Sequence, residues 1–287
     1  RGLGDVYKRQ IPISIKDLQM TKGVRTTGGS LAYKDRIPEA DCAVVARVLA
    51  AGAIMLGKTN SPEFGLLGAN ENRLGEPCRN PWNPERTSGG SSGGAAVSVA
   101  AAMVSISTGT DGGGSVRMPC AFTGIYGIKA THGRIPRYGG VSKLAANQTS
   151  SSGPMTRTVR DSAVLLEVMA GHDSREPGSL RKPVPNYTSN LKDGVSGMRI
   201  GYSFDLGYGA VEPYMIQAVE DAAKTFSELG ADVGEADLVL NPPPQEYWWK
   251  IWTGNQKAMY GDLAVSYTHL RAHETRHDIV CRLLLEK

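Results

Sequence analysis

The sequence predicts an α/β protein in which strands and helices pack in layers. Residues 11–15 alternate apolar and small side chains and are rich in β-branched types, which predicts a strand that ends at Lys16. Residues 39–51 carry apolar side chains at helical spacing up to Gly52, and residues 53–57 follow as a short buried strand. This strand–helix–strand order is typical of a layered α/β fold.

Two clusters rich in glycine and serine, GGSSGG and GTDGGGS, mark the segment 87–119. Glycine permits a positive φ or a close approach of the backbone to a ligand, at an entropic cost relative to alanine. The small apolar residues between the clusters predict a buried helix over 95–104 and a short strand over 104–108. We expect this rigid element to hold two serine-bearing loops near each other, which suits nucleophilic chemistry.

The other segments are assigned from breakers and periodicity. Residues 60–86 are predicted to be loop that covers the site, because glycine and proline interrupt them. Residues 247–260 contain three tryptophans, which we expect in the core, with a wall of an acyl pocket as the alternative. The remaining predictions are turns over 123–135, loop over 139–152, a helix over 160–169, a linker over 176–196, strands over 199–203 and 231–239, and a helix over 212–229.

Composition excludes several classes of protein. The chain has 32 basic and 28 acidic side chains, and no face with clustered Lys and Arg is visible, so nucleic-acid binding is not expected. No apolar run approaches the length of a membrane span. The four cysteines form no CxxC motif, which favours reduced thiols and a cytoplasmic location.

The serine clusters and their surroundings resemble the signature of the amidase signature family, serine hydrolases with a Ser–Ser–Lys triad. The matching text is GGSSGG followed by GTDGGGSVRMPCAFTGIYGIKATHGR, with Ser91 and Ser115 separated by 24 residues. Upstream, IPISIKD places Lys16 at the position of the family's lysine, and GKTNSPEF and NPWNPERT match the intervening segments. The resemblance covers residues 11–265 and implies a mixed central sheet covered by helices.

Three residues receive catalytic roles. Ser115 is the expected nucleophile, and a serine hydroxyl needs a neighbouring base to remove its proton. Lys16 at the end of a buried strand is the expected base, since burial lowers a lysine's pKa; a surface lysine is the alternative. Ser91 is expected to relay the proton between them, and the resemblance implies a cis peptide bond from Gly90 to Ser91. A flexible linker is the alternative for the GGSSGG cluster.

The glycine run before the nucleophile is the expected oxyanion hole. The backbone N–H groups of Gly112, Gly113 and Gly114, with that of Ser115, can point to the substrate oxygen. Asp111 and Arg117 are expected to order this loop, with a surface ion pair as the alternative. Ser92 is expected to help hold the first serine loop.

The expected reaction is hydrolysis of an amide through an acyl-enzyme. Ser115 attacks the carbonyl, Lys16 returns the proton to the leaving nitrogen through Ser91, and water releases the acyl group; esters are expected to react too. No metal or organic cofactor is required. The expected partner is a small-molecule amide substrate, without nucleic acid or membrane, and assembly into a homo-oligomer is left open.

Other functions are also considered. GSSGG matches the G-x-S-x-G elbow of α/β-hydrolases, but a breaker-rich loop precedes it where that motif needs a strand. HETRH at residues 273–277 matches H-E-x-x-H, a zinc-protease motif, and is attributed to chance. The nearest rival is a glutaminase like the signature-bearing subunit of glutamyl-tRNA(Gln) amidotransferase, although SPEF at residues 61–64 and the aromatic block look more like stand-alone amidases. A non-enzymatic binding module and a catalytically dead fragment complete the alternatives.

The two ends of the chain depart from the family's pattern. Residues 1–10 and 266–287 resemble translated adapter or vector sequence, so we expect a non-native leader and tail around an incomplete amidase-signature domain over 11–265, truncated at both ends. Excluding these ends removes most of the net charge: the first ten residues hold three basic and one acidic side chain, and the last 22 hold four and three.

Overall fold

The computed structural model describes residues 10–140, 149–237, 240 and 242–266. The chain forms two compact units, Arg1–Thr188 and Ser189–Lys287, and the predicted domain bounds of 11–265 stay a prediction. Apart from Gln10 and Ser266, the expected leader and tail lie outside the described residues, as does the HETRH match. None of the described helices combines the length and apolarity needed to cross a membrane.

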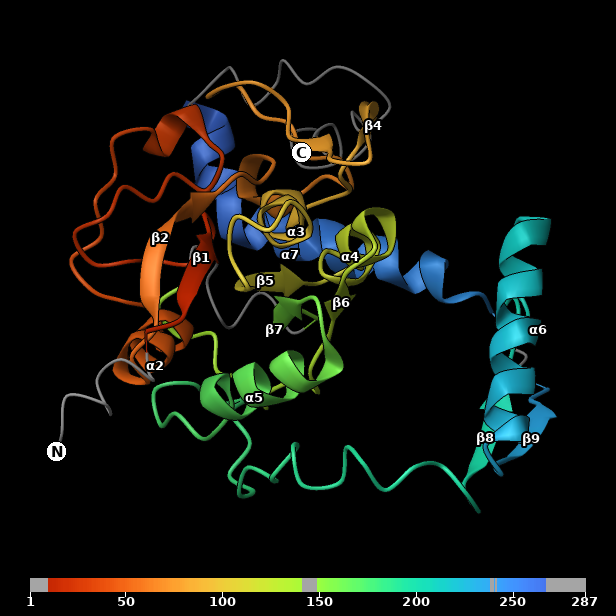
Figure 1. Cartoon of the computed structure of the whole chain (residues 1–287). Coiled ribbons are helices and arrows are strands. Elements are labelled where there is room, and N and C mark those ends of the chain that lie inside the picture. The colour runs from red at the N-terminus through yellow and green to blue at the C-terminus, as the bar shows by residue number, and fades with distance from the viewer. Residues whose placement is uncertain (1–9, 141–148, 238–239, 241, 267–287) are drawn as a thin grey trace, which may run out of the picture. The chain divides into compact units, whose positions relative to one another are not determined.

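A five-stranded mixed sheet forms the centre of the first unit (Figure 1). In spatial order the strands are β2 (Ile54–Thr59), β1 (Pro12–Lys16), β5 (Ile106–Asp111), β7 (Ser151–Thr156) and β6 (Tyr126–Gly127). β1 pairs in parallel with both β2 and β5, and β7 pairs antiparallel with β5 and β6. The predicted α/β class with a mixed central sheet is therefore confirmed.

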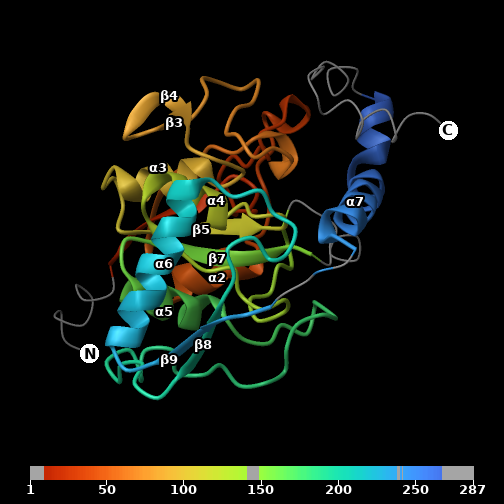
Figure 2. The same ribbon diagram turned by 90° about the vertical axis from the view of Figure 1, so that its right-hand side faces the viewer.

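Helices cover both faces of this sheet, as Figures 1 and 2 show. α2 (Ala43–Ala50) and α5 (Val159–Met169) contribute to one apolar core, and α3 (Gly93–Ala100) and α4 (Arg117–Thr123) lie on the other side. The members of the first core include Ile13, Ile15, Val44, Val45, Val48, Leu165, Leu166 and Met169, and those of the second are Ala95, Ala96, Val116, Cys120 and Met155.

The alternation of side chains along β1 positions the site. Ile13 and Ile15 enter the core with α2 and α5, so Ser14 and Lys16 face α3. Ser14 Oγ lies 2.8 Å from Ser98 Oγ of α3 and donates to Ser107 Oγ of β5 at 2.7 Å. Polar side chains therefore fill the space between β1 and α3, and Lys16 continues this row toward the start of the helix.

Several elements of the first unit differ from the sequence predictions. β5 extends from Ile106 to Asp111 instead of ending at 108, and α4 was not predicted. β7 begins in the last two residues of the predicted loop over 139–152 and continues beyond it. Gly153 and Pro154 of this strand are residue types that are common in turns, but a Cβ on Gly153 would stand 2.0 Å from Ile128 O. Close strand approach therefore requires this glycine. The predicted loop over 60–86 contains a hairpin of β3 (Arg79–Asn80) and β4 (Asn83–Thr87) and a 3-10 turn, η2 (Glu63–Gly65).

The described residues of the second unit form a small parallel ladder and two helices. β8 (Arg199–Tyr202) pairs with β9 (Asp232–Glu235), and α6 (Pro213–Glu228) connects them. The sequence predicted the two strands and the helix, but not the pairing. The aromatic block lies in α7 (Pro244–Ser266), where Trp248 stacks on Trp252 with ring centroids 5.1 Å apart. Trp249 is 49% exposed, so the predicted core position is wrong for this side chain.

Candidate active site

Lys16 is the largest fully buried side chain of the first unit, with no exposed surface. Its Nζ donates hydrogen bonds to Ser91 Oγ at 2.7 Å, Ser92 Oγ at 2.8 Å and Thr110 Oγ1 at 2.8 Å. Burial lowers the pKa of Lys16 well below its ordinary value, and the negative charge of Asp111 opposes this shift only in part. The alternative of a surface lysine is therefore excluded.

The first serine loop is buried and closely packed, which excludes the flexible-linker alternative. Ser91 is 2% exposed, and its peptide bond with Gly90 is cis, as the resemblance implied. A Cβ on Gly90 would stand 2.5 Å from the carbonyl oxygens of Leu67 and Ala69, and one on Gly94 would stand 2.5 Å from Asn60 N. The glycines of GGSSGG therefore allow backbone segments to touch.

Ser92 connects the serine loop to β5. Its Oγ donates to Thr110 O at 3.1 Å and accepts from Thr110 N at 3.2 Å and from Lys16 Nζ. These contacts agree with the expected holding role of Ser92. Thr110 itself was not predicted, and its contact with Lys16 arises from the pairing of β1 with β5.

Asp111 organises the loop that carries Ser115. Its carboxylate has no exposed surface and accepts from the backbone N–H groups of Gly114 at 2.8 Å and of Val116 and Arg117 at 3.2 Å. Arg117 also donates to it through Nε and Nη2, both at 2.9 Å. Burial alone would raise the pKa of Asp111, but the hydrogen bonds and charge of Arg117, with the backbone donors, lower it. The Asp111 carboxylate of this pair is fully buried, whereas the Arg117 side chain is 56% exposed, and the bonds to three backbone N–H groups agree with the expected loop-ordering role.

The predicted oxyanion hole requires one correction. The N–H of Gly114 points to Asp111 Oδ1, so this donor is occupied and unavailable to a substrate oxygen. Among the described residues, the N–H groups of Gly112, Gly113 and Ser115 have no hydrogen-bond partner. Three donors of the predicted set therefore remain.

The structure joins Lys16 and Ser91 through their side chains and brings in Ser115 through its backbone. Ser92 N donates to Ser115 O at 3.1 Å, which ties the two serine loops together. Ser115 is half-buried, and within the described part of the chain its Oγ takes part in no hydrogen bond. The hydroxyl-to-hydroxyl step of the relay thus stays a prediction.

The rival motifs find less support. β4 does precede the serine loop, so the breaker argument against the nucleophile elbow was wrong, but β4 belongs to an exposed two-stranded hairpin outside the central sheet. The nitrogen in contact with Ser91 Oγ is Lys16 Nζ, whereas the elbow requires a histidine. Across the described residues, no group of His, Cys, Asp and Glu is arranged to hold a metal, and Cys42, Cys78 and Cys120 are free thiols.

The mixed α/β sheet thus presents the buried Lys16 to a buried serine loop. The chain belongs to the amidase family, because the family model described as Amidase matches residues 10–270. The expected family membership is therefore confirmed.

The similar proteins are longer than this chain. A glutamyl-tRNA(Gln) amidotransferase subunit of Anaeromyxobacter sp. (strain K) is 44% identical over 228 residues, 79% of this chain and 46% of that protein. A bacterial aryl acylamidase of the amidase signature family superposes with a TM-score of 0.79 at 36% identity, over 92% of this chain and 54% of its own. The corresponding amidotransferase subunit from Thermotoga maritima superposes with a TM-score of 0.77 at 31% identity, over 96% and 63%. The chain spans about half the length of the curated relatives that it matches.

Proposed function

We propose that this chain carries the catalytic centre of an amide hydrolase in which Ser115 is the nucleophile, Ser91 the relay and Lys16 the base. The observation that carries the proposal is the 2.7 Å hydrogen bond between Lys16 Nζ and Ser91 Oγ in a fully buried setting. A lysine becomes a base only when it is neutral, and burial is the condition that favours the neutral form.

The hydrogen bonds that a neutral amine can make indicate how Lys16 would act. A neutral amine donates two hydrogen bonds and accepts one through its lone pair. Ser92 already donates its hydroxyl to Thr110 O, so it accepts from Lys16. The lone pair is then left for the hydroxyl of Ser91 or Thr110. With Ser91 as the donor, Lys16 accepts the hydroxyl proton of Ser91 while Ser91 accepts that of Ser115. Ser91 then remains a hydroxyl, and the Ser115 oxygen loses its proton as it attacks the carbonyl.

The loop before Ser115 would stabilise the charge that forms on the substrate oxygen. The unoccupied N–H groups of Gly112, Gly113 and Ser115 lie in a loop fixed by the buried carboxylate of Asp111. Each preorganised donor of this kind contributes about 2.7–4 kcal/mol in the transition state of acyl transfer. A carbonyl attacked by Ser115 would direct its oxygen to these donors.

The reaction would proceed in two halves. Attack by Ser115 breaks the amide bond when the proton held by Lys16 passes through Ser91 to the leaving nitrogen. Water then attacks the acyl-enzyme, gives a proton to the same relay and releases the carboxylic acid. Esters would react by the same route, because an alkoxide leaves with less help from an acid.

Hydrolysis of an aryl amide and of its matching ester tests the proposal. Ser115→Ala should abolish both activities, and Ser91→Ala should reduce amide hydrolysis more than ester hydrolysis, because the amide depends on proton delivery to nitrogen. Amide turnover that survives Ser115→Ala would refute the nucleophile assignment.

The names of the relatives support a second candidate, a glutaminase that works within a multi-protein complex. The glutamyl-tRNA(Gln) amidotransferase subunits are 40–45% identical to this chain, whereas the structural neighbours also include an aryl acylamidase and a peptide amidase. Ammonia release from glutamine that requires added partner subunits would favour this candidate, and turnover of aryl amides by the chain without partners would favour a stand-alone amidase. If neither ammonia release nor aryl-amide turnover is found, and no reagent labels Ser115 covalently, a binding module is favoured.

A further inference from the structure

The η2 turn (Glu63–Gly65) has an uncommon backbone conformation. Its Phe64 has a φ of 51°, which is rare for a bulky side chain. Such a conformation persists only where the surrounding structure determines it, and it is found preferentially at functional sites. The Phe64 side chain is 7% exposed and meets the ring of Tyr33 edge-on, with the centroids 6.0 Å apart. Tertiary packing therefore holds the turn in this conformation.

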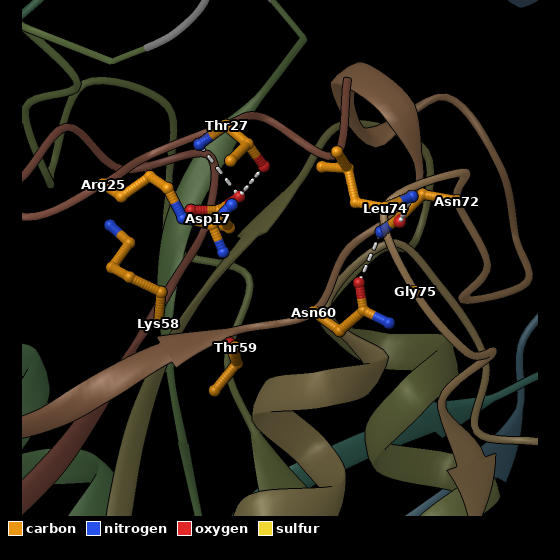
Figure 3. A pocket seen from close by; sticks show the side chains of 9 residues that line it. All are labelled: Asp17, Arg25, Thr27, Lys58, Thr59, Asn60, Asn72, Leu74 and Gly75. Atoms are coloured by element: carbon orange, nitrogen blue, oxygen red, sulfur yellow. Dashed lines mark hydrogen bonds between the residues drawn. The ribbon is translucent and has the colours of Figure 1, made fainter. Parts of the chain in front are cut away.

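Backbone hydrogen bonds tie the turn to the end of β1, directly after Lys16. Gly28 N donates to Asp17 O at 3.1 Å, and Phe64 N donates to Gly28 O at 2.7 Å. The Asp17 carboxylate also accepts from Thr27 N at 3.0 Å, a contact that Figure 3 shows at the edge of a polar cavity. The segment around Thr27 and Gly28 therefore connects β1 with the turn.

The same segment packs closely on the residues before the turn. A Cβ on Gly29 would stand 2.5 Å from Ser61 O and 2.7 Å from Pro62 O, so this approach requires glycine. Ser30 Oγ donates to Glu63 Oε1 at 2.6 Å. The turn cannot shift relative to β1 without breaking these contacts.

Gly65, the last residue of the turn, faces the side chain of Ser91. A Cβ on Gly65 would stand 3.1 Å from Ser91 Oγ, 3.6 Å from Ser91 Cβ and 2.7 Å from Leu18 Cδ1. Ser91 Oγ also lies 2.7 Å from Lys16 Nζ. The hydroxyl of Ser91 is therefore in contact with two groups that are fixed to β1, the amine of Lys16 and the backbone of the turn.

We propose that Gly65 is a positioning residue for the hydroxyl of Ser91. The backbone of Gly65 limits the space around this hydroxyl and keeps it at hydrogen-bond distance from Lys16 Nζ, and the missing side chain allows the close approach. The inference rests on the proposed relay from Ser115 through Ser91 to Lys16. It adds a residue that acts on the relay through Ser91, because proton transfer depends on alignment of the groups.

Hydrolysis of an aryl amide and of its matching ester by the 287-residue chain tests this role. Gly65→Ala should slow amide hydrolysis about tenfold or more, because the new Cβ displaces the Ser91 hydroxyl from its aligned position. The loss should appear in kcat rather than in KM, since substrate binding is not altered. Ester hydrolysis should fall less, because an alkoxide leaves with less help from an acid than an amide nitrogen does.

Gly23→Ala is the matched control. Gly23 has a φ of +71° and Gly65 one of +74°, so alanine causes the same backbone strain at both, but a Cβ on Gly23 would meet nothing within 4 Å. Gly23→Ala should therefore keep the parent's amide-to-ester ratio. An equal ratio in Gly65→Ala, with an active parent chain, would refute the positioning role and leave the proposed function intact. A parent chain that hydrolyses neither substrate would contradict the proposed function, and this inference with it.

A double variant, Leu18→Ala with Gly65→Ala, separates positioning from packing if the single variant does not fold. Truncation of Leu18 removes the Cδ1 atom that the new Cβ would approach to 2.7 Å, and the approach to Ser91 Oγ remains. The double variant should keep the low amide-to-ester ratio. A ratio equal to that of Leu18→Ala alone would show that Gly65 serves only packing and would overturn the proposal.

Discussion

Lys16 Nζ at the end of β1 lies 2.7 Å from Ser91 Oγ, two residues before the first residue of α3, and both side chains are buried. The contact joins residues 75 positions apart in the sequence and is enclosed by Ser92 and Thr110. Both forms of the amine find the same three hydroxyl neighbours, but burial removes the hydration of a charged ammonium and so disfavours it relative to the neutral amine. The protonation state of Lys16 is therefore the central property of the site.

The buried lysine predicts that stability rises with pH. Because burial holds the pKa of Lys16 well below 10.5, the unfolded chain binds one more proton than the folded chain between the two pKa values. The free energy of unfolding should therefore rise across that window, by up to about 1.4 kcal/mol per pH unit. Urea unfolding at several pH values measures this slope.

Lys16→Met supplies the comparison for that slope. Lys58, whose pKa burial lowers to about 8, contributes with the same sign, and Cys120, whose pKa burial raises to about 12, contributes with the opposite sign above its ordinary value of 9.0. Both groups are present in the variant, so the difference between the two curves isolates Lys16. Parallel curves would show that Lys16 is charged in the folded protein.

Gly90→Ala should destabilise the first unit by about 3 kcal/mol. The new Cβ would stand 2.5 Å from two backbone carbonyl oxygens, of Leu67 and Ala69, and backbone atoms cannot move aside as a flexible side chain can. Gly57→Ala is the matched control, because its Cβ would meet nothing within 4 Å. Denaturant midpoints of the two variants measure the difference, and equal midpoints would contradict the close packing of this loop.

Asp111→Asn should cost about 3 kcal/mol of stability and slow hydrolysis. Asn offers one oxygen where the carboxylate accepts from three backbone N–H groups and from Arg117, so donors of the Ser115 loop are left without partners. Because the pKa of Asp111 is lowered, its contribution is present above the ordinary value of 3.8 and is lost as the pH falls through the folded-state pKa. Asp111→Asn should not show this loss of stability at acidic pH.

The control for Asp111 is Asp35→Asn, which removes an exposed pair with Lys34 at 3.9 Å. Exposed pairs of this kind contribute little, so its unfolding curve should match that of the parent chain. Thermal or urea unfolding between pH 3 and 7 compares the three proteins. An Asp111→Asn curve that coincides with the Asp35→Asn curve would show that the carboxylate does not order the loop.

Local patterns predicted the elements whose signal lies within their own residues. The helix at Val159–Met169 and the strand at Pro12–Lys16 were expected within a few positions, because their apolar spacing and β-branched residues belong to one segment. The strand at Ser151–Thr156 was not expected from the sequence, because it is polar and contains Gly153 and Pro154. Its conformation depends on the neighbouring strands β5 and β6, which no local pattern reveals.

The catalytic set was predictable only in part for a similar reason. Lys16, Ser91 and Ser115 stand in text that resembles a known signature, so their positions could be expected. The contact of Thr110 with Lys16 depends on how β5 and β1 pair, and the loss of the Gly114 donor depends on where Asp111 points. Both follow from three-dimensional geometry rather than from residue types.

Covalent labelling by a fluorophosphonate tests the assignment of Ser115 and Lys16 most directly, because it reports the activated serine without requiring a known substrate. We expect peptide mass spectrometry to find the label on Ser115, and Lys16→Met to slow labelling by about 10²–10⁴-fold, the usual contribution of a general base. Labelling at another serine, or at an unchanged rate in Lys16→Met, would contradict the assignment.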